Sequence, residues 1–261
     1  MKVENGSTNM SMIRMTWNVA RALPGRSLAL VAALLLGAAF VLPAQQATKA
    51  PAGKETTIED LFLKSVEFQI LREKAFSEDY DLKMNALDDL EKKINDGTYA
   101  SNSQQAEFVL EYLALEGSAR MTRASGRLVN NFPEVRRRSA SMLGRLGTDE
   151  AKDALVRVLL IDDEPIVKAE AAYGLGVIGK NPDNEVVQAI AFAFAQEDPT
   201  KPDNNFAYAL CLSVEKLSQK TPGGIRDPAA YQILVKIAQG NYLRTVKVKA
   251  LQVLDQLKAA K

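Results

Sequence analysis

Apolar residues recur at helical spacing along the chain from Ile58 to the C-terminus. Ile58, Phe62 and Val66 fall four residues apart, and similar apolar lines run through 82–94 and 106–113. A spacing of three or four residues places side chains on one face of an α-helix, whereas a half-buried strand alternates every second residue. That alternation is not sustained over the length of a strand anywhere in the sequence. The pattern therefore predicts an all-α fold with essentially no sheet.

From residue 133 the chain repeats itself. The segment Pro133–Gly147 matches Pro165–Gly179, and two looser copies follow within 204–217 and 244–257. A pair of antiparallel helices cannot bury its apolar face alone, so the copies predict an α-solenoid, a superhelix in which neighbouring pairs bury one another. Four columns stay apolar in all copies: Val135, Val167, Phe206 and Val246; Ala140, Ala172, Cys211 and Leu251; Leu143, Leu175, Val214 and Leu254; Leu146, Ile178, Leu217 and Leu257.

The second copy resembles a short HEAT repeat of the phycobilisome-lyase-like type. Residues 162–168 read DDEPIVK, an acidic turn followed by proline, and residues 171–179 read AAYGLGVIG, a small pair followed by Leu-Gly-x-Ile-Gly. The specific motif covers about residues 130–180 and the looser pattern 80–261. The resemblance implies a right-handed stack of helix pairs whose second helices line a concave binding face. It also implies contact with a protein partner in most members of the family and catalysis in few.

The first 44 residues are typical of a secretory signal peptide. Three arginines precede the sixteen uncharged residues 27–42, and a small residue, Ala44, follows them. A membrane span needs about 20 apolar residues, so cleavage after Ala44 is favoured over an uncleaved anchor. We therefore expect a periplasmic or secreted protein without stable membrane insertion. A start at Met12 or Met15 would give a signal of ordinary length.

The rest of the chain divides into three parts. Residues 45–55 form a polar, flexible leader, 56–131 an N-terminal helical region of divergent repeats, and 132–261 the HEAT-like repeats. The signal segment carries four of the 33 basic and one of the 32 acidic residues. The remaining chain is therefore slightly acidic, which argues against a nucleic-acid-binding protein.

Few residues suggest catalysis. The chain has no histidine and a single cysteine, which excludes histidine-based nucleophile systems, histidine-ligated zinc and intramolecular disulfides. Residues 174–180 fit the spacing of phosphate-binding loops, but these glycines close a predicted helix, whereas such loops open one. We expect Cys211 to be a buried small residue and the acids 162–164 to stabilise a helix N-terminus. The sequence thus predicts no cofactor and no metal site.

A block of arginines is the feature most suggestive of binding. Arg120, Arg123 and Arg127 are spaced as one stripe of a helix, and four further arginines follow on the next repeat helix. Arg136 occupies the column of Lys168, so we expect it to be structural. The segment 118–160 is basic, whereas the preceding region, 45–117, is acidic.

Arg137, Arg138 and Arg145 lie outside the apolar columns and are expected to face solvent. In the next copy Tyr173 occupies the position equivalent to Ser141, one stripe away from the equivalent of Arg145. Two interpretations stay open: the arginines pair with the acidic N-terminal region, or they bind an acidic partner. The candidate partner-binding residues are Arg127, Arg137, Arg138, Arg145 and Tyr173.

Two function classes follow from these features. The first is an exported, non-enzymatic scaffold that binds a protein through the concave face of the solenoid. The second, implied by the lyase-like resemblance, is an enzyme or enzyme subunit that uses carboxylates and arginines on that face. The sequence favours the scaffold, because no cluster of reactive side chains supports a reaction.

Overall fold

Helices make up most of the chain that the computed structural model describes, residues 57–98 and 103–259. The predicted signal peptide and leader lie outside these residues. Ten α-helices, one short 3-10 helix and one small hairpin are described. They are α1 (Ile58–Phe76), α2 (Tyr80–Asn95), α3 (Ser103–Leu115), β1 (Arg123–Ala124), β2 (Arg127–Leu128), α4 (Pro133–Leu146), α5 (Asp149–Ile161), α6 (Pro165–Ile178), η2 (Pro182–Asn184), α7 (Glu185–Ala195), α8 (Asn204–Lys220), α9 (Pro228–Gln239) and α10 (Arg244–Ala259).

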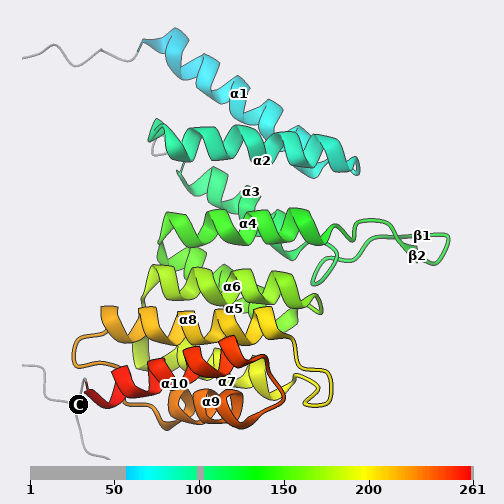
Figure 1. Ribbon diagram of the computed structural model, residues 1–261. Coiled ribbons are helices and arrows are strands. Elements are labelled where there is room, and N and C mark those ends of the chain that lie inside the picture. The colour runs from blue at the N-terminus through cyan, green and yellow to red at the C-terminus, as the bar shows by residue number, and fades with distance from the viewer. Residues whose placement is uncertain (1–56, 99–102, 260–261) are drawn as a thin grey trace, which may run out of the picture. The chain divides into compact units, whose positions relative to one another are not determined.

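Within the unit Glu55–Lys261 the helices stack in two layers (Figure 1). The helices α2, α4, α6, α8 and α10 contact one another in sequence and form the first layer, which will be called the inner layer. The second layer consists of α3, α5, α7 and α9, each packed against its neighbours in the first. This arrangement of neighbouring helix pairs confirms the predicted all-α, HEAT-like solenoid.

The ends of the two best-preserved repeat helices follow the predicted signals. Pro133 and Pro165 occupy the first turn of α4 and α6, where a missing backbone donor costs nothing. Gly147 and Gly179 cap the other ends at φ of 71° and 74°, a left-handed conformation that favours glycine. The glycines of 174–180 therefore close a helix, as the sequence predicts.

The same glycines let the inner helices approach closely. A Cβ atom built on Gly144 would lie 2.7 Å from the Cα of Gly174, on the facing helix α6. A Cβ atom on Gly176 would lie 2.7 Å from the Cα of Ser213 on α8. Neither position has room for a side chain, so these glycines fix the spacing of α4, α6 and α8.

The predicted columns form the core, with one exception. Leu143, Leu175 and Val214 are fully buried, and Cys211 is buried as expected. Leu251, however, is 52% exposed, although the repeat alignment places it in the column of Cys211. That prediction is wrong: Leu251 lies on α10, the last described helix, and the described residues leave about half of this side chain uncovered.

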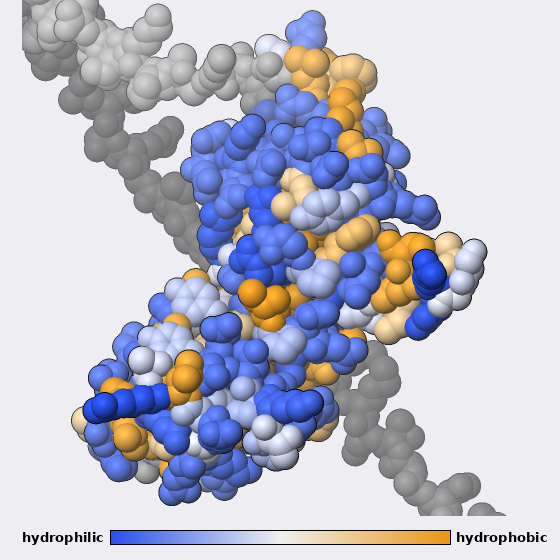
Figure 2. Space-filling view, turned by 45° about the vertical axis from the view of Figure 1, so that its right-hand side comes forward, coloured by the Kyte–Doolittle hydropathy of each residue, from blue (hydrophilic) through white to orange (hydrophobic). Residues whose placement is uncertain are grey.

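The apolar line of α1 is also largely exposed. Ile58, Phe62 and Ile70 face solvent, whereas Leu71 and Ala75 near the end of the helix are buried. Hydrophobic residues of this first helix are visible at the top of Figure 2. Helix α1 therefore joins the core mainly through its last turns.

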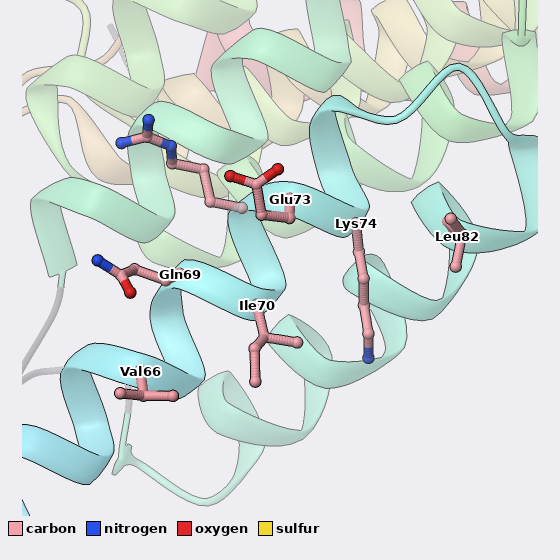
Figure 3. Close-up of a pocket in the computed structure, with 7 residues that line it drawn as sticks. Val66, Gln69, Ile70, Glu73, Lys74 and Leu82 are labelled. Atoms are coloured by element: carbon pink, nitrogen blue, oxygen red, sulfur yellow. The ribbon is translucent and has the colours of Figure 1, made fainter.

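A shallow pocket lies beside this exposed line, between α1 and α2 (Figure 3). Val66 and Ile70 from α1 and Leu82 from α2 supply its apolar surface, and Lys74 borders it. Ile70 and Leu82 are exposed, whereas Val66 is half-buried and Lys74 forms an ion pair with Asp89.

The expected helical stripe of Arg120, Arg123 and Arg127 is not formed. The segment is a hairpin, in which Arg123 pairs with Leu128 and Ala124 with Arg127. Ser125 and Gly126 have φ of 50° and 77°, the positive values that a tight two-residue hairpin turn requires. The helical prediction is wrong because this local turn, which serine and glycine tolerate, overrides the three-to-four spacing of the arginines.

Candidate protein-binding groove

A groove of about 470 Å³ crosses the inner layer from α4 to the start of α10. Its exposed apolar and aromatic side chains come from three successive elements: Ile166 and Tyr173 on α6, Tyr208 on α8, and Leu243 just before α10. Arg137 of α4 lies at one end of the groove. Exposed apolar residues gathered in a concavity are characteristic of binding surfaces.

The groove is built from equivalent positions of successive repeats. Arg137, Ala169 and Tyr208 form one column of the repeat alignment, and Tyr173 and Leu212 belong to a neighbouring column four residues on. Positions three or four residues apart share a helix face. The helices α4, α6 and α8 therefore present the same stripe toward the groove, whereas α10 contributes the start of its first turn.

The two tyrosines give the groove its anchoring surface. Tyr173 is 37% and Tyr208 40% exposed, and the Nζ atom of Lys216 lies 5.3 Å from the ring centroid of Tyr173. Neither tyrosine hydroxyl makes a hydrogen bond within the described residues. Both hydroxyls and the exposed part of each ring are therefore available together, although Lys216 lies over one face of the Tyr173 ring. An apolar ring with a polar hydroxyl is a combination enriched at protein interfaces.

Arg137 is tied to two carboxylates at the groove end. Its Nε and Nη2 atoms donate to Glu134 at 2.9 and 2.6 Å, and Nη1 lies 3.6 Å from Glu170. The hydrogen bond from Arg137 lowers the pKa of the Glu134 carboxyl, so this acid stays ionised to lower pH. Arg137 thus borders the groove with its charge largely balanced.

Arg138 and Arg145 connect α4 to the acidic helix α2. Arg138 donates to Asp88 at 2.8 Å and to Glu91 at 2.9 Å, while Arg145 donates to Glu91 at 3.0 Å and to Asn95 at 3.3 Å. The Arg138 side chain is only 19% exposed, so the expectation that it faces solvent is wrong. The carboxylates of α2 draw it into the interface between repeats. Of the two interpretations left open by the sequence, pairing with the acidic N-terminal region is the one that these contacts show.

The five candidate residues therefore lie in three places. Arg137 and Tyr173 line the groove, and Arg138 and Arg145 lie between α2 and α4. Arg127 is exposed on the hairpin. A role for any of them in binding a partner stays a prediction.

Sequence analysis missed the rest of the groove. Ile166, Tyr208 and Leu243 contribute much of its apolar surface, and none was a candidate. The repeat alignment contains a signal for Tyr208, because this tyrosine occupies the column of Arg137. An aromatic residue at a polar, non-core column of a repeat is the pattern that would have identified it.

Asp162 and Cys211, to which the sequence assigns structural roles, are both buried. Asp162 is buried against Arg136, and its Oδ1 atom accepts a hydrogen bond from the backbone N–H of Glu164 before α6 begins. Cys211 is fully buried, and this burial raises the pKa of its thiol to about 12. In the described ranges, no group of three or more acidic or cysteine residues is arranged to hold a metal ion.

Comparison with known proteins agrees with the repeat analysis. The chain matched none of the curated proteins with which it was compared. None of the helices in the described residues has the length and apolar character needed to cross a membrane. Residues 126–211 match the family model for HEAT repeats, a segment that runs from the hairpin to Cys211 and includes α4, α5 and α6 entirely. HEAT repeats indicate a scaffold for protein interaction, and residues 126–211 of the chain are similar to such repeats.

Proposed function

We propose that this protein is an exported, non-enzymatic scaffold that binds an extended segment of another protein in the groove of its inner layer. The observation that carries the proposal is the groove itself, in which Tyr173, Tyr208, Ile166 and Leu243 are exposed side by side. Tyrosine and arginine concentrate binding energy at protein interfaces. Both residue types are present, since Arg137 borders the groove.

The direction of the groove supports an extended occupant. It crosses the inner helices, which pack about 8–10 Å apart in such stacks, so four helices span about 24–30 Å. A chain in β conformation covers that distance with about eight residues. The Asn205 side chain is exposed at the groove, and its amide offers both a donor and an acceptor to the backbone of such a segment.

A pair of matched variants tests this proposal. Tyr173→Ala with Tyr208→Ala removes both groove aromatics, whereas Phe62→Ala with Phe192→Ala removes two exposed aromatics that lie elsewhere. The tagged proteins are used to recover partners from envelope extract, and the recovered proteins are quantified by mass spectrometry. We expect one protein to be recovered with the wild type and the control but lost with the groove variant. Equal recovery with both variants would contradict a role for the groove.

Export is supported by the charged start, the apolar segment 27–42 and the small residue Ala44. We infer that the mature protein begins at Gln45 and is found in the periplasm or outside the cell. Sequencing the N-terminus of the protein from its native source tests this inference. An intact segment 27–42 in the membrane pellet would contradict it.

The non-enzymatic part of the proposal rests on the side chains of the groove. Its polar lining consists of paired charges, amides and hydroxyl groups, without a reactive nucleophile beside a base. The phycobilisome-lyase-like subtype stays a prediction from the sequence. Turnover of a small molecule by the purified protein, abolished by the groove variant, would favour the alternative of a lyase-like enzyme.

A further inference from the structure

The hairpin between α3 and α4 carries positive charge that no nearby acidic residue in the sequence compensates. Between Gly117 and Phe132 the sequence contains three arginines and no acidic residue. Residues 119–127 are all exposed. In Figure 1 the hairpin projects away from the stack, and in Figure 2 it forms the protrusion on the right, where hydrophobic and strongly hydrophilic residues adjoin.

The base of the hairpin is firmly anchored. Asn130 is buried, and its side chain accepts a hydrogen bond from the N–H of Thr122 at 2.8 Å and donates one to the carbonyl of Arg120 at 2.7 Å. The N–H of Gly117 donates to the same carbonyl at 2.9 Å. Arg136, in turn, donates to the carbonyl of Glu116. The hairpin is therefore held in one position, which lowers the entropy cost of binding through it.

The hairpin arginines differ from those of α4 in having no carboxylate partner. Arg120 stacks over Tyr112 at 5.1 Å, and Arg123 donates to the carbonyl of Gly126 at 3.5 Å. In the part of the chain that the structure describes, none of the three hairpin arginines forms an ion pair. Their charges are thus available to an external carboxylate, with which the guanidinium forms two parallel hydrogen bonds.

Each face of the hairpin combines a charge with an apolar side chain. Successive residues of a strand point to opposite faces, so Arg123 shares a face with Met121, while Arg127 shares the other with Val129. Met121 and Val129 are both exposed. A flexible segment can contact both faces of such a projection, whereas a flat bilayer can contact only one.

The loops next to the hairpin are acidic, which disfavours the binding of a wide, negatively charged surface to this side of the stack. The loops that lead into α2, α6 and α8 lie on the same side of the stack as the hairpin (Figure 1). They contain the acidic pairs Glu78–Asp79, Asp163–Glu164 and Glu197–Asp198. Glu197 forms an ion pair with Lys168, but the other five carboxylates have no ion-pair partner in the described residues. These five would repel an extended phosphate surface that approached this side, whereas a narrow partner reaches the projecting hairpin alone.

We propose that the hairpin is a second docking element, which binds an acidic, flexible segment of a partner protein. Arg123 and Arg127 hold carboxylates of that segment on opposite faces of the hairpin, and Met121 and Val129 each contact an apolar side chain of the segment on their own face. This element is separate from the groove, and binding to it does not require Tyr173 or Tyr208.

A fluorescent peptide of repeated Asp-Glu-Leu triplets serves as the probe, and its anisotropy is measured with the full chain. The hairpin variant is Arg123→Glu with Arg127→Glu. The control, Lys64→Glu with Lys236→Glu, changes the net charge equally at exposed lysines that have no ion-pair partner in the described ranges. We expect the hairpin variant to bind about tenfold more weakly and the control within about twofold of the wild type. Binding should also weaken as ionic strength rises from about 0.1 to about 1 M.

Further outcomes separate the alternatives. Equal loss of peptide binding in both variants, or no salt-dependent binding at all, would overturn the proposal. Hairpin-dependent binding to phosphatidylglycerol vesicles without binding to the peptide would overturn it in favour of a lipid surface. Dimerisation abolished by the hairpin variant, again without peptide binding, would assign the surface to a second copy of the chain. Unchanged peptide binding by Tyr173→Ala with Tyr208→Ala supports an element independent of the groove, and unchanged thermal melting of the hairpin variant supports an intact fold.

Discussion

The Nε atom of Arg136 on α4 lies 2.6 Å from the Oδ2 atom of Asp162, just after α5, and both side chains are almost completely buried. Arg136 also donates to the side chain of Asn131 and to the carbonyl of Glu116. Glu116 in turn forms a buried ion pair with Lys83 of α2. Buried charges thus connect three successive helix pairs beneath the hairpin.

Removing one member of the Arg136–Asp162 pair should strongly destabilise the fold. Asp162→Ala leaves the guanidinium buried without its carboxylate, which costs about 3–5 kcal/mol. Asp163→Ala, at the exposed neighbouring position, should change stability by less than about 0.5 kcal/mol. The free energies of unfolding in urea provide the comparison. Similar values for the two variants would show that the pair does not contribute as described.

A variant of Leu175 tests the alignment of the repeats, which places this residue in a buried column. This side chain is fully buried, so Leu175→Asp should lower the melting temperature sharply, because an unpaired buried carboxylate costs several kcal/mol. Gln252→Asp, at an exposed position of α10, should leave the melting temperature almost unchanged. Thermal unfolding followed by circular dichroism measures both. Equal effects at the two positions would rule out the register.

The close approach of α6 and α8 is tested at Gly176. Gly176→Ala forces a methyl group against the Cα of Ser213 and should cost about 1–3 kcal/mol. Ser213→Ala is the matched change on the facing helix. The Ser213 hydroxyl is buried without a hydrogen-bond partner in the described residues, so this variant should be neutral or slightly more stable. A Gly176→Ala variant as stable as the wild type would mean that the two helices are not in such tight contact.

The thiol of Cys211 should be unreactive in the folded protein. Its burial raises the pKa to about 12, so almost no thiolate forms at pH 8. We expect maleimide labelling to be slow in buffer and fast in denaturant. Because the folded pKa lies above that of the unfolded thiol, the stabilising contribution is complete below about pH 8.5 and is lost as the pH rises toward 12. Rapid labelling under native conditions would contradict the buried position.

The sequence predicts those parts of the fold that depend on local pattern. The proline and glycine that begin and end α4 and α6, and the buried columns of Leu143 and Leu175, follow from spacing and backbone preference alone. Leu251 belongs to the same pattern but is exposed, because the spacing of apolar residues defines a helix face and does not determine which other helix covers it.

The arginine block shows why the surface is harder to predict. Arg138 and Glu91 are 47 residues apart in the sequence, and they meet only because α2 and α4 are neighbours in the stack. Composition indicates attraction between an acidic and a basic region, but it does not show which arginines form ion pairs with the acidic region. Arg123 and Arg127 form no ion pair with α2, because the hairpin turn at Ser125 and Gly126 places them away from that helix. Tyr208 was missed for a different reason. A single exposed aromatic residue does not indicate a binding site in the sequence, and only the fold shows that Tyr208 lies in one groove with Tyr173 and Leu243.

Site-specific photo-crosslinking tests the groove most directly. Benzoylphenylalanine is placed at Tyr208 in the groove or at Phe192 on α7, two positions of similar chemistry that are both exposed. Each protein is irradiated in cells of its native source, and the products are identified by mass spectrometry. The groove proposal predicts one protein crosslinked through position 208, at residues of an extended segment, and no such product from position 192. No product from position 208, or the same product from both positions, would contradict it.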